Sequence, residues 1–209
     1  MSVIDDILTR LTNISNTWRP IAIVWHAFFA VIVILLLIGI RPSKRITGIL
    51  IALPLLSVSI IAFLSLDPFN GIIFAVICIL VIVVSMKLPH EKIQIAPIVI
   101  LIPGIVMFLF GWAYPYFLDT SSNWSFLYSS PTGLIPCPTL AIVIGLALIL
   151  NGFESRNLSL ILGISGMFYG IFGAIILGVT IEWVLLLGSL VILLLAIVGK
   201  RHVWIKKSA

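Results

Sequence analysis

Long runs of apolar residues, separated by short polar connections, recur along the whole chain. A helix that crosses a bilayer needs about 20 mostly apolar residues, and seven stretches approach this length. They are Ile21–Ile40, Ile46–Leu66, Gly71–Met86, Ile95–Phe117, Pro136–Asn151, Leu158–Gly178 and Ile181–Gly199. The pattern predicts an all-α integral membrane bundle of seven transmembrane helices. The third and fifth runs are short for a full span, and Pro103-Gly104 interrupts the fourth run.

The N-terminal segment has a different pattern, in which apolar positions recur at helical spacing among polar ones. The apolar positions are Ile4, Ile7, Leu8, Leu11 and Ile14. This spacing favours a short amphipathic helix at the membrane interface, with a frayed tail as the alternative. We therefore expect one transmembrane domain over residues 1–209. It would consist of an interfacial segment at 1–19, a seven-helix bundle at 20–199 and a basic cytoplasmic tail at 200–209.

The composition supports a membrane protein and excludes several other classes. Hydrophobic residues make up 62% of the chain and charged residues only 9%, and the mean hydropathy is +1.32. Average soluble domains carry about 25% charged residues. A soluble enzyme, a disordered chain, a disulfide scaffold and a nucleic-acid-binding module are thereby excluded. The two cysteines, Cys78 and Cys137, belong to different spans at different predicted depths, which argues against a disulfide.

The positions of the basic residues predict the orientation. Ten of the twelve Lys and Arg residues fall in the connections after the first, third and fifth spans and in the tail. Only Arg10 and Arg19 fall on the opposite side. Because cytoplasmic loops are enriched in Lys and Arg, we expect the N-terminus outside and the C-terminus inside the plasma (inner) membrane of a cell.

The most distinctive motif is Pro136-Cys137-Pro138-Thr139, which opens the fifth predicted span. Proline suits the first turn of a helix, and the free N–H groups of a helix N-terminus favour a thiolate. Cys137 is therefore either a reactive, ligand-facing thiol on the outer side or a small packed residue at a rigid helix start.

Two further ionisable residues are candidates for a site. His26 lies within the first span, where an ionisable side chain usually faces the bundle interior or a wet cavity. Glu182 lies in a tight turn between the last two spans. A metal or cation site is one arrangement that the outer polar residues allow, although their scattered positions match no compact ligand motif. The residues concerned are His26, Asp67, Asp119, Cys137 and Glu182.

The sixth predicted span carries a series of glycines, and no familiar enzyme motif accompanies it. Gly163, Gly166, Gly170 and Gly173 share one helical face, which favours close helix packing within the chain or against a partner, including a second copy. The chain lacks His-Glu-x-x-His, Gly-x-Ser-x-Gly and a phosphate-binding glycine loop. No catalytic residue and no cofactor is assigned, and any metal stays unknown.

Four short elements resemble a family of uncharacterised bacterial multi-pass membrane proteins, a domain of unknown function with a Pro-Cys-Pro-Thr motif. They are Asn16-Thr17-Trp18-Arg19-Pro20, Tyr114-Pro115, Pro136-Cys137-Pro138-Thr139, and Gly178-Val179 with Glu182. The resemblance implies an all-helical inner-membrane protein without an established activity, and it points to Cys137, its flanking prolines, Thr139 and Glu182. The family's histidine before the Tyr-Pro pair is replaced here by Trp112-Ala113.

Three functional hypotheses follow. The first is a pocket open to the outer side that serves transport or sensing of a small molecule or ion. Its predicted lining is His26, Trp112, Tyr114, Cys137, Thr139 and Glu182. The second is a structural or assembly partner of another membrane protein, in contact with it through the glycine face. The third is a membrane enzyme that uses Cys137 as nucleophile or metal ligand, with His26 or Glu182 as the base.

Overall fold

The computed structural model describes residues 3–205, with side chains described for residues 4–198. Within this range the chain is helical, and its one β-type contact is an isolated bridge between Ser43 and Lys92. The α-helices are α1 Val3–Thr17, α2 Arg19–Leu37, α3 Lys44–Leu64, α4 Pro68–Met86, α5 Ile98–Trp112, α6 Phe126–Ser129, α7 Pro136–Ile149, α8 Arg156–Ile171 and α9 Trp183–Ile205. Shorter helical elements are η1 Asn123–Ser125, η2 Asn151–Glu154, η3 Phe172–Ile176 and η4 Thr180–Glu182. The predicted all-α class is confirmed.

Several helices begin at a proline or a capping side chain. Pro20, Pro68 and Pro136 lie in the first turns of α2, α4 and α7, where the missing N–H has no intrahelical partner to lose. Asp67 caps α4, because its Oδ1 accepts a hydrogen bond from the Asn70 backbone N–H at 3.2 Å. The sequence thus specifies these starts locally.

Five helical segments are long and apolar enough to cross a membrane. They are Arg19–Leu37, Lys44–Leu64, Pro68–Met86, Arg156–Ile176 and Thr180–Val198. The helices α5 and α7 are apolar but have only 15 and 14 residues. The predicted extension of the fourth run to Phe117 is wrong, because α5 ends at Trp112 and Pro115 disfavours a helical Tyr114. The expected interruption at Pro103-Gly104 is also wrong, since α5 continues through both residues.

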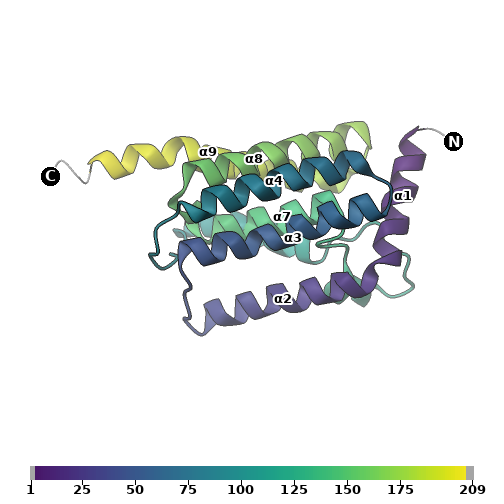
Figure 1. The fold of residues 1–209 in the computed structure, drawn as a ribbon, viewed down its shortest axis with the longest axis horizontal. Helices are drawn as coiled ribbons and strands as arrows, with labels where there is room; N and C mark the ends of the chain where they lie inside the picture. Colours follow the sequence, from purple (N-terminus) through teal and green to yellow (C-terminus); the bar gives the residue numbers. More distant parts are fainter. Residues whose placement is uncertain (1–2, 206–209) are drawn as a thin grey trace.

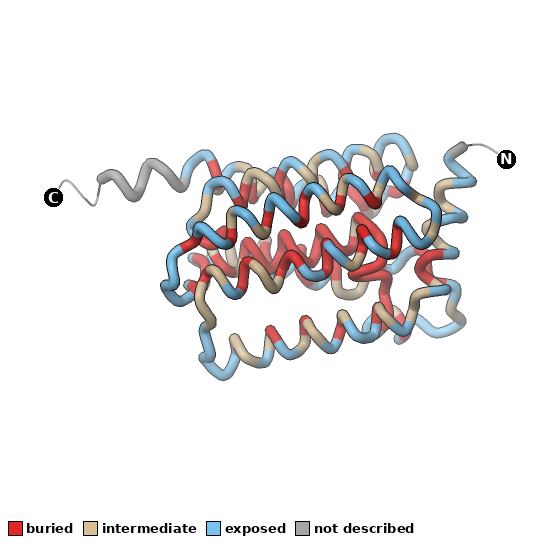
Figure 2. Tube along the Cα trace, viewed as in Figure 1, coloured by how far each residue is buried: buried red, intermediate tan, exposed pale blue. Residues whose placement is uncertain are grey.

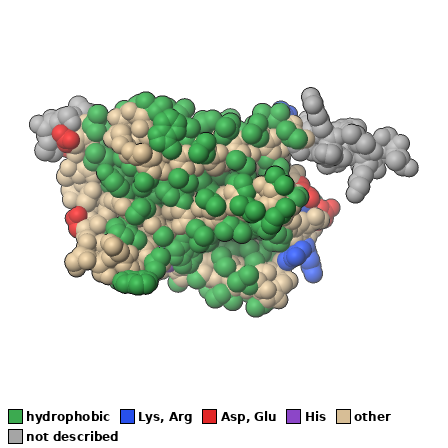
Figure 3. Space-filling view, turned by 180° about the vertical axis from the view of Figure 1, so that it is seen from behind, with side chains coloured by type: hydrophobic (Ala, Val, Ile, Leu, Met, Phe, Trp, Pro, Cys, Tyr) green, Lys and Arg blue, Asp and Glu red, His purple; other side chains and the backbone are tan. Residues whose placement is uncertain are grey.

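The surface has the character of a protein embedded in a bilayer. Apolar side chains cover most of the face shown in Figure 3, and the acidic and basic side chains visible there lie at the two ends of the bundle. Soluble monomers rarely expose apolar patches larger than a few hundred Å². This distribution and the long apolar helices support a membrane-embedded protein.

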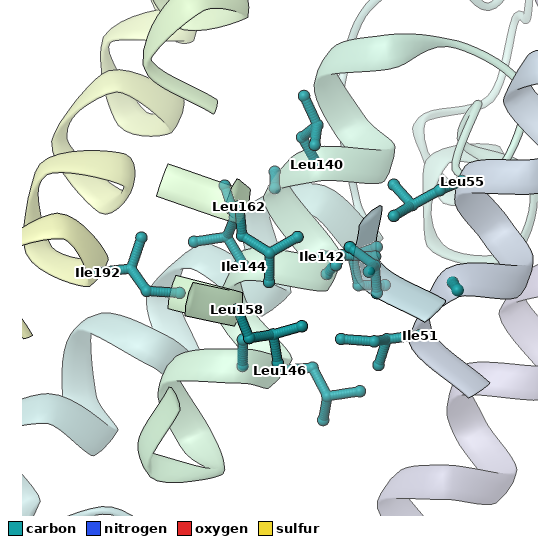
Figure 4. Packing of buried hydrophobic residues seen from close by; sticks show 14 of the residues in the cluster. Ile51, Leu55, Leu140, Ile142, Ile144, Leu146, Leu158, Leu162 and Ile192 are labelled. Atoms are coloured by element: carbon teal, nitrogen blue, oxygen red, sulfur yellow. The ribbon is translucent and has the colours of Figure 1, made fainter. Parts of the chain in front are cut away.

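The short helix α7 lies at the centre of the bundle and is buried along most of its length (Figure 2). Its side chains meet those of α3, α8 and α9 in the core shown in Figure 4. Glycines allow α5 to approach it closely. A Cβ at Gly111 would lie 2.3 Å from the Ile142 backbone nitrogen, and a Cβ at Gly145 would lie 2.3 Å from the Phe108 backbone nitrogen. Small residues at a helix interface are typical of membrane bundles.

The glycine face of α8 packs against α9 of the same chain. A Cβ at Gly163 would lie 2.6 Å from Leu193 Cγ, and a Cβ at Gly170 would lie 3.0 Å from the Leu186 backbone. The face is therefore filled from within the chain and is not free to receive a second protein. A partner that binds elsewhere on the surface stays a prediction.

The N-terminal helix α1 runs across one end of the bundle, at a steep angle to the long helices (Figure 1). A helix in this segment was predicted and is confirmed, whereas its place at a membrane interface stays a prediction. The predicted basic tail covers residues 200–209. The structure does not describe the side chains of these residues, and residues 206–209 lie outside the described part of the chain.

Candidate functional site: a pocket under the N-terminal helix

A pocket of about 400 Å³ is lined by residues of α1 and of the helix ends beside it. Its walls come from α1, the first turns of α4 and α7, the last turns of α8, and the η4 turn before α9. Most of the lining is apolar. The polar and ionisable lining side chains are Asp6, Arg10, Asp67, Asn70, Cys137, Tyr169 and Glu182. An apolar pocket with a few convergent polar groups is typical of small-molecule sites.

Local backbone geometry places Glu182 at the wall of this pocket. The α8 helix ends in the π-helical turn η3, and Gly178 follows with a positive φ of 69°, which glycine adopts without strain. The Val179 backbone N–H then donates to the Gly173 carbonyl at 3.0 Å. A Cβ at Gly173 would lie 2.6 Å from Glu182 Cγ, so the absent side chain leaves the space that Glu182 occupies.

The Glu182 carboxylate is buried and only half paired. Its exposed fraction is 1%. The Tyr114 hydroxyl, itself fully buried, donates a hydrogen bond to Oε1. Within the described part of the chain, Oε2 has no hydrogen-bond partner. A buried carboxylate oxygen without a donor is costly, and such an exception in a folded protein calls for an explanation.

Cys137 lies beside Glu182 on the same pocket wall. It is the second residue of α7, is partly buried, and forms no disulfide. Cys78 is also a free thiol, in agreement with the sequence prediction. The Cys137 thiol lies close enough to Glu182 to interact with it electrostatically, but a thiol is only a weak hydrogen-bond donor.

Charged and polar groups from α1 and α4 form the rim. Arg10 Nε donates to Asp6 Oδ2 at 3.0 Å, and both side chains are more than half exposed. The Tyr169 hydroxyl donates to Asn70 Oδ1 at 2.7 Å, and the Asn70 amide in turn donates to Asp67 Oδ2 at 2.6 Å. The Nε of Arg10 is thus paired with Asp6 at the rim.

His26 and Trp112 belong to a different cluster. The two ring nitrogens of His26 lie 2.8 Å from the Ala22 carbonyl and 2.9 Å from the Trp112 carbonyl. The Ser130 hydroxyl donates to the same Trp112 carbonyl at 2.6 Å. The Trp112 indole N–H donates to the Leu127 carbonyl at 2.7 Å. These contacts tie α2 and α5 to the segment that leads into α7.

Thr139 also has local structural partners. Its hydroxyl accepts a hydrogen bond from the Gly133 backbone N–H at 2.8 Å and donates to the Ile135 carbonyl at 2.7 Å. It holds the buried turn over residues 130–135 against the start of α7. Neither Thr139 nor the His26 cluster lines the pocket.

The structure therefore divides the six residues predicted from sequence. Cys137 and Glu182 line the pocket, with Tyr114 directly behind Glu182, while His26, Trp112 and Thr139 lie elsewhere. Asn70 and Tyr169 also line the pocket but were not predicted from the sequence. Their signal was a polar residue in the first turn of an apolar helix and a lone tyrosine among glycines.

The described residues hold no group of three or more His, Cys, Asp or Glu side chains that would suit a metal ion. The scattered metal site considered from sequence is thus not assembled here. No protein-family model matches the chain, and neither the curated proteins nor the solved structures gave a match.

Proposed function

We propose that this chain is a multi-pass membrane protein that binds a small molecule or ion in the pocket under α1, for transport or for sensing. The observation that carries the proposal is the buried, half-paired carboxylate of Glu182 at the wall of a 400 Å³ pocket. A pocket of this size accommodates a small organic molecule. An unpaired ionisable group inside a membrane protein is by default a functional site.

The membrane arrangement we propose has seven spans, of which α5 and α7 are short; α7 lies at the centre of the bundle, and α5 packs against it with one face exposed. Arg41, Lys44, Arg45, Lys87, Lys92 and Arg156 belong to connections and helix ends opposite the pocket. By the positive-inside rule the pocket then opens to the outer side of the inner membrane. The amphipathic α1 lies at the outer interface.

Reporter fusions test this topology. We expect a fluorescent-protein fusion to be bright after residue 90 and after residue 155, and alkaline phosphatase to be active after residue 67 and after residue 122. The reverse activities at these four positions would overturn the orientation. The fusions after residues 90 and 122 flank α5, and those after residues 122 and 155 flank α7. If the two positions that flank either helix report the same side of the membrane, the count of seven is overturned.

Native mass spectrometry with metal analysis tests the pocket, on protein gently extracted from its own membrane. We expect a bound small molecule that is lost in Glu182→Gln and weakened in Cys137→Ala. Cys78→Ala is the matched control, because Cys78 is buried between α3 and α4, where its thiol contacts the Ala52 carbonyl at 3.5 Å. Retention of the molecule in Glu182→Gln, or loss in Cys78→Ala alone, would contradict a pocket site.

A second candidate is a membrane enzyme with Cys137 as nucleophile. The observation that suggests it is that Cys137 and Glu182 line the same pocket, so that a carboxylate is available as the base that a thiol nucleophile requires. The test is covalent labelling by a membrane-impermeant maleimide. Rapid labelling of Cys137 that slows in Glu182→Gln supports an activated thiol, and equal rates in the two proteins oppose it.

An assembly role has less support. The glycine face that suggested it is covered by α9. Co-purification of a second polypeptide in a fixed ratio, with an empty pocket, would shift the assignment to this role.

A further inference from the structure

We infer that the pocket selects a lipophilic amine, whose ammonium group pairs with Glu182 Oε2. This inference rests on the proposed function and names the chemical class of its ligand. Glu182 lines the pocket, and its Oε2 is a buried oxygen atom that lacks a hydrogen-bond donor among the described residues. A ligand that supplies an N–H donor satisfies it, and a cation supplies the stronger hydrogen bond.

The charge balance of the lining favours a cation over an anion. Four of its side chains are ionisable as acids or bases, apart from Cys137 and Tyr169. Asp6, Asp67 and Glu182 are acids, and Arg10 is the one base. Since Arg10 pairs with Asp6, Asp67 and Glu182 are left as the acids that face an incoming ligand. An anionic ligand would meet these two carboxylates without a free basic partner in the described lining.

The remaining lining selects for an apolar body. Phe117, Phe172 and Leu177 border the space next to Glu182 and contribute no polar side-chain group. Aromatic faces also attract ammonium groups, most strongly where water is excluded. A fully hydrated ion such as Na⁺ would gain little from these walls, whereas an amine with an apolar substituent would use both the carboxylate and the walls.

The size of the pocket agrees with this class. A volume of about 400 Å³ lies near the lower end of the range for small-molecule sites. The rim residues Asp6, Arg10 and Phe69 are exposed, whereas Glu182 is buried. A ligand can thus enter from the end of the bundle and place its charged group inside.

Three probes with one skeleton test the inference: phenylbutylamine, phenylbutanol and phenylbutyrate. They present a cation, a neutral hydroxyl and an anion on the same apolar body. Binding is measured by titration calorimetry on the full chain in nanodiscs of zwitterionic phosphatidylcholine, with empty nanodiscs subtracted. We expect the amine to bind at least about tenfold more tightly than the alcohol, and the carboxylate most weakly.

Glu182→Gln should weaken amine binding by at least about tenfold and leave alcohol binding nearly unchanged. Asp67→Asn keeps a capping side chain for α4 and should weaken the amine by only about threefold, because the rim is partly solvated. Glu91→Gln, at the opposite end of the bundle, is the matched control and should leave the affinities for all three probes unchanged.

The outcomes separate this inference from the proposed function. If the alcohol or the carboxylate binds as tightly as the amine, or if amine binding survives Glu182→Gln, the amine class is wrong while a pocket that binds small molecules stands. If none of the probes binds, the amine class is overturned. The proposed function is then decided by the bound molecule in the mass-spectrometric experiment.

Discussion

Among the residues that the structure describes, each end of the bundle buries one charged side chain, but the two ends compensate its charge differently. At the end opposite the pocket, Lys44 is only 3% exposed, and its Nζ contacts carboxylates of both Glu91, at 2.9 Å, and Glu154. At the pocket end, Glu182 is 1% exposed; the Tyr114 hydroxyl donates to its Oε1, and its Oε2 has no hydrogen-bond partner among the described residues. A buried charge that is paired with opposite charges stabilises the fold. A buried carboxylate oxygen without a hydrogen-bond partner can instead accept a hydrogen bond from a ligand.

The Lys44 cluster also supports an unusual backbone. Asn151, Gly152, Phe153 and Glu154 all have positive φ values, between 53° and 60°. Left-handed conformations cost non-glycine residues about 1–2 kcal/mol each. The Lys44–Glu154 contact and the burial of Phe153 hold this turn between α7 and α8. No comparable ionic contact surrounds Glu182 in the described structure, which is the difference the following variants examine.

Lys44→Met should have the largest effect on stability. Removal of the ammonium group leaves two carboxylates facing each other beside a strained turn. We expect a loss of about 2–3 kcal/mol in the free energy of unfolding, less than for a fully buried pair because both glutamates reach solvent. The measurement is thermal unfolding of the purified protein in one detergent.

Lys92→Met is the control for this variant, since Lys92 follows Glu91 in the connection between α4 and α5 at the same end of the bundle and is exposed. It should change stability by less than about 0.5 kcal/mol. A triple variant, Lys44→Met with Glu91→Gln and Glu154→Gln, should recover part of the loss because no charge then lacks a partner. If Lys44→Met is as stable as the native protein, the Lys44 cluster does not stabilise the fold, and the contrast with Glu182 is wrong.

The sequence predicts the helices better than it predicts the two charged clusters. Apolar runs and first-turn prolines predict α3, α4, α7 and α8 to within a few residues at most ends, because these signals are local. Lys44 was interpreted only as a cytoplasmic loop charge. Its partner Glu154 lies 110 residues away, and no periodicity in one chain connects such distant positions.

The candidate site was predicted in part, for a related reason. Proline flanks and a tight turn mark Cys137 and Glu182 as unusual from sequence alone, and the structure brings both to one pocket. His26 showed an equally strong signal, that of an ionisable residue in a span, but backbone carbonyls lie within hydrogen-bond distance of both its ring nitrogens. Whether a buried polar group is paired depends on the tertiary contacts, which composition and spacing do not contain.

Tyr114→Phe should have an intermediate effect. The variant leaves Oε1 of Glu182 without its donor, so both oxygens of a buried carboxylate become unpaired. We expect a loss of about 1–2 kcal/mol in the free energy of unfolding, measured as for Lys44→Met. Tyr116→Phe is the matched control, because Tyr116 is 45% exposed and should lose almost nothing. A loss of the same size in both variants would show that the hydroxyl bond to Glu182 contributes little.

Glu182→Gln should have the smallest effect on stability, and in the opposite direction. The Gln amide oxygen can still accept the Tyr114 hydrogen bond, while the cost of burying an ionisable carboxylate is replaced by the smaller cost of burying a neutral amide. We expect the free energy of unfolding to stay equal or to rise by up to about 1 kcal/mol, as is common where a site carries strain for function.

The sign of this change separates the two ends of the bundle more clearly than its size. If Glu182 were a structural residue like Lys44, its neutralisation would destabilise the protein by more than about 1 kcal/mol. If it is kept for a ligand, Glu182→Gln gives a protein that is at least as stable and yet binds its ligand less tightly. Unfolding and binding measured on the same preparation distinguish these cases, because a merely misfolded variant would lose both.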